Sequence, residues 1–410
     1  MKNFDELAIK PCNILIPQNS DIHEKWAVIA CDQYTSQPEY WEKVSQITAG
    51  FPSSLNITFP EVYLEDDDCE KRIETINAKM KEYLDTNIFQ PLENSFVLVE
   101  RTLPGGASRK GLVAAIDLEH YDYSPDSSSL VRATEGTVLE RIPPRVKIRE
   151  NAPLELPHIM ILIDDPKKTV IEPLFEKSFP KIYDFDLMMY SGHLTGYQVS
   201  NPDDHCEVLS ALKNLMSNCP LLYAVGDGNH SLASAKAYWT ALKETLSPEE
   251  ISVHPARYAL AELVNLHDDS LVFEPIHRIC TETNPEEFLQ EFKKYFSNKP
   301  EMGNIQKFNY IHGNISGEIE IPNCTHTLEI GTLQEFLTAY SSKIKVDYIH
   351  GSDVVKELAA KPDSIGFILP VMHKNLLFKS VSQSGVLPRK TFSMGEAYEK
   401  RFYFECREIK

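Results

Sequence analysis

The segment 221–239 constrains the fold of this chain more than any other. It begins with a short apolar run, Leu221 to Val225, whose length is typical of a buried strand. It ends, over 232–239, in Ala, Leu and Lys at helical spacing with no helix breaker. A tight polar turn with the glycines Gly226 and Gly228 lies between the two. The segment therefore predicts a buried strand that passes through this turn directly into a helix.

The turn has the composition of an anion site. It can direct several backbone N–H groups, together with the positive end of the helix dipole, at one point. Asp227 and His230 lie inside it, so acid–base or metal chemistry is available beside a bound phosphate. A purely structural interpretation fits equally well, because Asn229 or Ser231 can serve as the N-cap of the helix. The spacing alone leaves both interpretations open.

The bulk composition excludes several classes of protein. The 410 residues contain 41 Lys and Arg against 60 Asp and Glu, a net charge of −19, which argues against a broad nucleic-acid or anionic membrane surface. The chain has no apolar run as long as a membrane span and no signal-like N-terminal core, and its eight cysteines have no metal-ligand spacing. We expect a soluble, cytoplasmic protein with no membrane and no nucleic-acid partner.

A second informative stretch covers 130–149, where cations concentrate in an acidic chain. Guanidinium groups suit phosphate and carboxylate oxygens, and two threonine hydroxyls add donors. The alternative is a solvated helix face with ordinary salt bridges, although the paired prolines 143–144 count against a plain helix. The cations are Arg132, Arg141, Arg145, Lys147 and Arg149, and the threonines are Thr134 and Thr137.

Further candidate ligand contacts lie elsewhere in the chain. A buried strand predicted at 26–31 leads directly into Asp32, which suits a ligand crevice. The strand-like run from Leu271 ends in the pair His277-Arg278. The constrained loop 385–396 contains Lys390 and Thr391, which suit an anion, although a plain surface loop has the same composition.

The overall pattern predicts an α/β to α+β fold with a mixed sheet and helices. Strand-like runs at 96–101, 110–117, 158–163 and 257–266 and helical patterns at 69–84 and 286–296 support this class. The composition changes near Thr281, where a more polar, loop-rich sequence with short alternating runs begins. We expect a main α/β domain over 1–280 that carries the turn. A smaller α+β unit would cover 281–410, and its C-terminal segment is a candidate to return to the main domain.

Three ordered motifs resemble the domain-of-unknown-function (DUF) family 1015. They are the sequences at 226–231, 275–278 and 387–392, and the stretches 30–34 and 132–145 fit as well. The resemblance spans nearly the whole chain. It implies a core similar to the ParB/sulfiredoxin-like superfamily, with large insertions. That superfamily includes free-serine kinases that use ADP or ATP.

In that superfamily a strand, a glycine-containing turn with His and usually Arg, and a helix bind nucleotide phosphates. The matching turn here is 227–231, and Ser231 stands where many relatives carry arginine. The resemblance implies ATP or ADP together with Mg²⁺. The missing positive charge would come from another segment, and its candidates are Arg132, Arg141, Arg145 and Arg278.

The best interpretation is a phosphotransferase that moves a phosphoryl group between a nucleotide and a small hydroxylated metabolite, with serine or phosphoserine as the first candidate. The candidate catalytic residues are Asp227, His230, Asp32 and Glu135. Asp227 is the candidate metal ligand, and His230 would contact the transferred group. The candidate phosphate-binding residues, which we expect to converge on the turn, are Gly228, Asn229, Ser231, Arg132, Thr134, Thr137, Arg141, Arg145, His277, Arg278, Lys390 and Thr391.

Two other functions fit the same residues. A phosphohydrolase of a small phosphate ester would use the same donors with water as the acceptor. A non-catalytic nucleotide-sensing module would bind nucleotide tightly without turnover. The sequence leaves the choice of nucleotide and metabolite, the direction of reaction, the catalytic base and the oligomeric state open.

Overall fold

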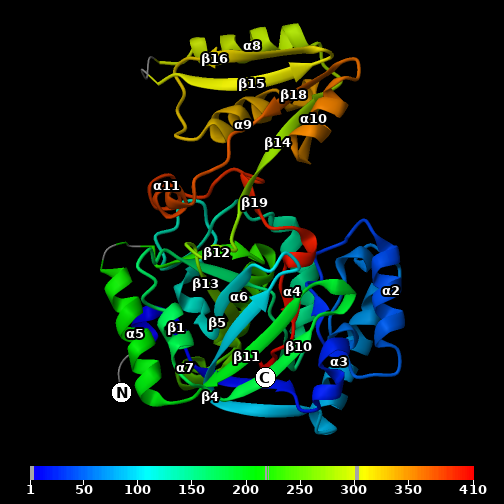
Figure 1. The fold of residues 1–410 in the computed structure, drawn as a ribbon, viewed down its shortest axis with the longest axis vertical. Coiled ribbons are helices and arrows are strands. Elements are labelled where there is room, and N and C mark those ends of the chain that lie inside the picture. The colour runs from blue at the N-terminus through cyan, green and yellow to red at the C-terminus, as the bar shows by residue number, and fades with distance from the viewer. Residues whose placement is uncertain (1–3, 218, 220, 301–303) are drawn as a thin grey trace. The chain divides into compact units, whose positions relative to one another are not determined.

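The computed structural model describes residues 4–217, 219, 221–300 and 304–410. It divides into two compact units (Figure 1), and each is described here by itself. The first unit comprises Met1–Leu271 together with Glu396–Lys410, and the second comprises Val272–Gly395. Within the described residues, no helix is long and apolar enough to cross a membrane.

A large mixed sheet forms the centre of the first unit. Among the described residues it has eleven strands, in the order β10-β11-β4-β5-β13-β9-β12-β7-β6, with β1 beside β5 and β2 beside β4. Most neighbours are antiparallel, but β13 and β9, β12 and β7, and β6 and β7 pair in parallel. The strands are β1 (Ile9–Lys10), β2 (Cys12–Pro17), β4 (Phe89–Thr102), β5 (Ser108–Asp117), β6 (Tyr121–Asp122), β7 (Val131–Ala133), β9 (Met160–Ile163), β10 (Lys181–Asp186), β11 (His193–Val199), β12 (Tyr223–Asp227) and β13 (Tyr258–Asn265). The predicted mixed-sheet class is therefore confirmed.

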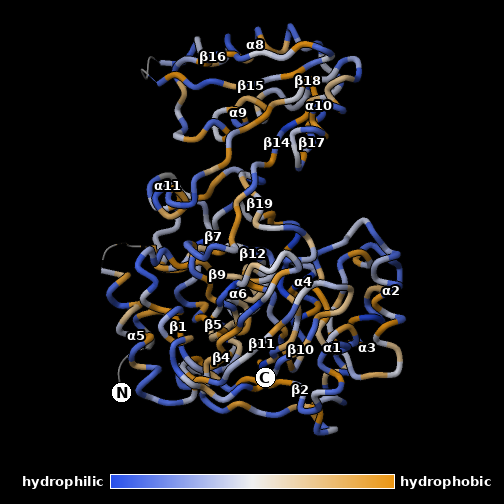
Figure 2. Tube along the Cα trace, in the orientation of Figure 1, coloured by the Kyte–Doolittle hydropathy of each residue, from blue (hydrophilic) through white to orange (hydrophobic). Residues whose placement is uncertain are grey.

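Helices cover this sheet, and apolar residues fill the layers between them. Figure 2 shows the apolar colour concentrated along the central strands. Two buried clusters result, one built around Trp26, Trp41 and Val113, the other around Ile161 and Trp239. The helices are α1 (His23–Trp26), α2 (Pro38–Thr48), α3 (Cys69–Asp85), α4 (Ile142–Glu150), α5 (Pro202–Met216), α6 (Asn229–Lys243) and α7 (Pro248–Val253).

The organising segment folds as predicted. β12 is buried through Val225 and leads at Gly228 into α6, which buries Leu232, Ala235 and Trp239. Helix α4 packs against α6, so the cation-rich stretch lies beside the helix of the turn. The paired prolines fall in the first turn of α4, where a missing N–H costs nothing.

The predicted strand at 26–31 is shorter than expected. Trp26 ends the short helix α1, where its Nε1 donates a hydrogen bond to the Phe404 carbonyl oxygen, and only β3 (Val28–Ile29) is extended. The run is apolar because its residues 26–30 are buried, and not because it lies inside the main sheet. Its partner is β20 (Phe402–Tyr403), a two-residue strand of the C-terminal segment.

The C-terminal segment, Glu396–Lys410, pairs with two short strands of the first unit. β20 pairs with β3, and β21 (Arg407–Glu408) pairs with β8 (Leu154–Glu155). The segment is buried, and it brings charged side chains into the interior that are neutralised there. Arg407, for example, donates to the Glu155 carboxylate at 2.8 Å.

The second unit is an antiparallel sheet packed against helices. Its strand order is β16-β15-β18-β14-β17, with β19 beside β14. A cluster of phenylalanines, including Phe288, Phe292 and Phe367, forms its core. Its elements are β14 (Phe273–Thr281), α8 (Pro285–Ser297), β15 (Gln306–His312), β16 (Ile315–Ile321), α9 (Glu329–Ala339), β17 (Lys345–His350), α10 (Ser352–Ala359), β18 (Ser364–Ile368), α11 (Leu377–Ser384) and β19 (Phe392–Met394).

Candidate functional site

The turn after β12 is built by one glycine in a left-handed conformation. Gly228 has φ +76°, and a Cβ atom there would lie 3.0 Å from the Ile159 Cα atom. A side chain would therefore be both strained and crowded. No side chain caps the N-terminus of α6 within the described residues. The first backbone N–H groups of α6 and the positive end of its dipole thus belong to this turn.

Asp227 lies at the end of β12 with its charge compensated. Its Oδ1 accepts a hydrogen bond from the Gly228 N–H at 2.9 Å, and its Oδ2 lies 3.4 Å from the Lys400 ammonium. Its side chain keeps 21% of its surface exposed. Burial alone would raise the pKa of Asp227, but the charges of Lys400 and His158 lower it below its usual value. Asp227 is therefore an ionised, partly exposed carboxylate.

A chain of polar groups runs from Cys31 through Tyr403 and His158 to Asp32. The Cys31 backbone N–H donates to the Tyr403 hydroxyl at 2.9 Å, and that hydroxyl lies 3.0 Å from His158 Nδ1. The Tyr403 hydroxyl therefore links the Cys31 backbone to the His158 ring. Asp32 Oδ2 lies 3.8 Å from His158 Nε2, on the other side of the ring. These contacts hold the imidazole between Tyr403 and Asp32.

His230 ties the turn to the segment after β7. Its Nε2 accepts a hydrogen bond from the Val138 N–H at 3.2 Å, while the Thr134 hydroxyl donates to the Val225 carbonyl oxygen at 2.7 Å. Asn229 Oδ1 and Thr137 Oγ1 are buried without a hydrogen-bond partner among the described residues. Unsatisfied buried polar atoms are costly, so Thr137 has a donor left for a phosphate, while Asn229 Oδ1 can accept a hydrogen bond from a ligand.

Two of the predicted cations of the first unit, Arg132 and Arg145, have protein partners of their own. Arg145 forms an ion pair with Glu61 and donates to the Arg141 carbonyl oxygen, and the Arg141 side chain is exposed. Arg132 is buried and donates through Nε to the Ser129 carbonyl oxygen at 2.7 Å. Glu135 is partly buried in the loop after β7.

The four candidates of the second unit lie close to one another. Arg278 is fully buried, and its Nη2 lies 3.1 Å from the carbonyl oxygens of both Arg389 and Lys390. The Thr391 hydroxyl donates to the carbonyl oxygen of Pro388 at 2.6 Å, and His277 Nδ1 accepts from the Leu369 N–H. These contacts belong to the second unit alone. Convergence of these residues on the turn of the first unit stays a prediction.

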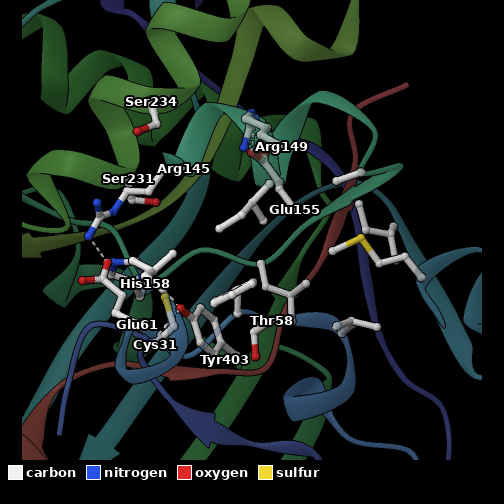
Figure 3. Close-up of a pocket in the computed structure, with 18 residues that line it drawn as sticks. Cys31, Thr58, Glu61, Arg145, Arg149, Glu155, His158, Ser231, Ser234 and Tyr403 are labelled. Atoms are coloured by element: carbon white, nitrogen blue, oxygen red, sulfur yellow. Dashed lines mark hydrogen bonds and ion pairs between the residues drawn. The ribbon is translucent and has the colours of Figure 1, made fainter. Parts of the chain in front are cut away.

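A cavity of about 130 Å³ opens beside the turn within the first unit (Figure 3). Eight polar side chains and the Arg149–Glu155 ion pair meet eight apolar side chains in its wall. The polar lining residues are Cys31, Thr58, Glu61, Arg145, His158, Ser231, Ser234 and Tyr403, together with the pair Arg149 and Glu155; the apolar ones are Ile57, Phe59, Leu64, Met80, Ile148, Ala152, Leu154 and Leu156. Ser231 and Arg145 are the only predicted site residues of this wall among the described residues.

Sequence reasoning missed Lys400, His158, Tyr403 and Glu61. Their positions depend on pairing between distant segments, which single-sequence patterns do not reveal. One signal was present, because the aromatic run Phe402-Tyr403-Phe404 is typical of a buried strand.

This site offers few carboxylates as ligands for a metal ion. The described residues contain no group of three or more His, Cys, Asp or Glu side chains suited to a metal ion. Mg²⁺ is usually held by only one or two carboxylates together with substrate phosphates. Asp227, ionised and partly exposed, fits that mode of binding.

Comparison with known proteins shows the family. The model of "Protein of unknown function (DUF1015)" matches residues 9–367, so the chain belongs to the DUF1015 family. No curated protein matches. Among solved structures, a free serine kinase variant in complex with ADP is 11% identical with a TM-score of 0.39, covering 73% of this chain and 92% of that one. SbnI from Staphylococcus aureus, with a C-terminal truncation, is 9% identical with a TM-score of 0.37, covering 69% and 82%.

Proposed function

We propose that this protein is a phosphotransferase that moves a phosphoryl group between ATP or ADP and a small hydroxylated metabolite, with serine or phosphoserine as the first acceptor to test. One observation carries the proposal. An ionised carboxylate, Asp227, lies at the turn that begins α6, where the helix N-terminus and Gly228 favour an anion. Phosphoryl transfer needs anion donors and a carboxylate in this combination.

The donors have distinct roles in this proposal. The first N–H groups of α6, the Asn229 amide and the Thr137 hydroxyl bind the phosphates. Lys400 adds the positive charge that the turn itself lacks, since Ser231 carries none. Bound Mg²⁺ would neutralise charge on the phosphoryl oxygens, and Asp227 would be its ligand.

Asp32 and Glu135 are the candidates to accept the proton of the hydroxyl. His158 supports Asp32 in this role, because the Tyr403 hydroxyl orients its ring toward the Asp32 carboxylate. A carboxylate in reach of a hydroxyl can act as a general base, which contributes roughly 10²- to 10⁴-fold to the rate.

The state of Cys31 argues against a cysteine-dependent phosphatase. Burial and the nearby carboxylates of Asp32 and Glu61 raise the pKa of the Cys31 thiol far above its usual value. The thiolate is the nucleophilic form of cysteine, and it is not populated here at neutral pH.

The experiment is a panel of transfer and phosphate-release assays with the full chain. Purified protein is incubated with Mg²⁺ and ATP or ADP, with serine and other small alcohols as acceptors, and with phosphoserine in the reverse direction. Acceptor-dependent phosphorylation is the expected result. Phosphate release from phosphoserine without nucleotide would instead indicate the hydrolase, and micromolar nucleotide binding without turnover would indicate the sensing module.

A further inference from the structure

The cavity beside the turn is unusually apolar for a site that handles phosphates. Eight of its lining residues are hydrocarbon or thioether side chains, contributed by 57–64, α3, α4 and 152–156. In Figure 3 the labelled side chains of Glu61, Arg145, Cys31, His158 and Ser231 gather at one side. The labelled pair Arg149 and Glu155 lies apart from them. The cavity therefore has one polar end, and the rest of its wall combines the eight apolar residues with this ion pair.

The size of the cavity limits its occupant. Protein interiors are close-packed and contain few voids larger than a water molecule. A volume of about 130 Å³ is close to that of an engineered apolar cavity of about 150 Å³ that binds benzene. Pockets for whole drug-sized ligands measure roughly 300–1,000 Å³. The cavity suits one compact group of a ligand and not an entire nucleotide.

The polar groups in the wall are largely engaged with one another. Glu61 pairs with Arg145, and Arg149 pairs with Glu155 at 2.6 Å. The Ser234 hydroxyl donates to the His230 carbonyl oxygen at 2.6 Å. A nucleobase buried here would have to leave ring nitrogens without partners or break these pairs, and both are costly. A hydrocarbon group meets neither cost.

We propose that this cavity binds the compact apolar group of a small amphipathic molecule whose hydroxyl end faces Ser231 and His158. The binding claim stands on the cavity alone. The further claim, that this molecule is the phosphoryl acceptor, rests on the proposed function. It favours a hydroxylated acceptor with a branched or aromatic substituent over serine, whose side chain is a single hydroxymethyl group.

The test is direct binding of benzyl alcohol to the full chain, without nucleotide, by saturation-transfer NMR and calorimetry. Benzyl alcohol carries one hydroxyl and one compact apolar ring. The wild type should bind it saturably, and glycerol, which has hydroxyls but no apolar group, should not displace it. Absence of saturable binding to the folded wild type would overturn the proposal, and so would displacement by adenosine, because a nucleobase would then be the occupant.

Cavity-filling variants locate the binding. Leu64→Trp adds volume to the cavity wall, and Leu84→Trp makes the same change on α3 at a partly buried position of the same apolar cluster that does not line the cavity. Leu64→Trp should weaken benzyl alcohol binding at least tenfold, while Leu84→Trp should leave it unchanged. Ala152→Leu is a second filling variant, used if circular dichroism shows that Leu64→Trp does not fold. Unchanged binding in the folded filling variant would contradict the proposal.

Turnover separates this inference from the proposed function. If the protein transfers phosphate, kcat/KM should be at least tenfold higher for an alcohol with an isobutyl or phenyl substituent than for serine, and the filling variant should abolish that preference. If no acceptor is phosphorylated but benzyl alcohol binds in the cavity, the proposed function fails and the binding inference holds. A preference for serine that Leu64→Trp leaves intact would contradict the acceptor claim.

Discussion

The Lys400 ammonium lies 3.4 Å from the Asp227 carboxylate and connects the C-terminal segment to the turn that begins α6. Both side chains are largely shielded, with 16% and 21% of their surfaces exposed, so solvent screens their attraction only in part. The pair keeps Asp227 ionised despite its burial, and it brings a positive charge to a turn whose own sequence has none.

Replacing Lys400 should shift the acid side of the pH profile. Burial opposes ionisation of Asp227, while Lys400 and His158 lower its pKa. Since the folded-state pKa is depressed, the stabilisation from Asp227 is present above its unfolded pKa and is lost as the pH falls through the folded pKa. In Lys400→Met the pKa of Asp227 should rise, moving the acid limb of both activity and stability to higher pH. Lys400→Arg, which keeps the charge, should retain the wild-type limb. An unchanged limb in Lys400→Met would show that Lys400 does not control Asp227.

The glycine of the turn should tolerate no side chain. Gly228→Ala imposes a left-handed conformation on alanine, at a cost of about 1–2 kcal/mol, and places its Cβ against Ile159. Gly50→Ala is the matched control, because Gly50 has a similar φ of +80° but no atom within 4 Å of the added Cβ. Urea denaturation should show a larger loss for Gly228→Ala than for Gly50→Ala. Equal losses would mean that the close approach to Ile159 has no energetic effect.

Removing the Tyr403 hydroxyl should destabilise the first unit. Tyr403→Phe leaves the Cys31 N–H without its acceptor and His158 Nδ1 without its hydrogen-bond partner, which should cost about 1–3 kcal/mol. Tyr190→Phe removes a hydroxyl from a side chain that is 97% exposed and should have no effect. Chemical denaturation of both variants is the measurement. Equal stability of the two would contradict the assigned hydrogen bonds.

The ion pairs of the C-terminal segment should contribute far more than surface pairs. Arg401 is buried, contacts Glu262, and donates to Glu405 at 2.6 Å. Arg401→Met leaves two buried carboxylates uncompensated, which should cost about 3–5 kcal/mol. Lys307→Met breaks exposed pairs of the second unit and should leave the melting temperature nearly unchanged. Comparable melting temperatures for the two variants would contradict the expected difference in stability between the buried and the exposed ion pairs.

Elements with strong local patterns could be predicted from the sequence. The helix predicted at 69–84 is α3 (Cys69–Asp85), the strand predicted at 110–117 is β5 (Ser108–Asp117), and β12 with α6 follows the predicted order. The apolar run at 26–31 was misleading, because burial and not strand pairing explains its composition. Apolar composition indicates burial directly, whereas only the spacing of apolar residues along the chain indicates a helix or a strand.

The candidate site was harder to predict because half of it comes from distant segments. The turn residues were identifiable, since glycine and helix formers leave a local signal. Lys400 and Tyr403 were not, because only the pairing of β20 with β3 brings them to Asp227 and His158. The many cations at 130–149 indicated that positive charge is available, but not where each side chain points. Arg132 and Arg145 have protein partners of their own.

The central claim, that Asp227 and the turn carry phosphoryl transfer, is tested most directly by the turnover of Asp227→Asn and His230→Ala with Mg²⁺ and nucleotide. We predict that both variants remain folded and lose about 10²- to 10⁴-fold in transfer rate. Asp164→Asn, which changes a carboxylate paired with His267 at 2.7 Å elsewhere in the first unit, should keep the wild-type rate. Wild-type transfer rates in both Asp227→Asn and His230→Ala would contradict the account.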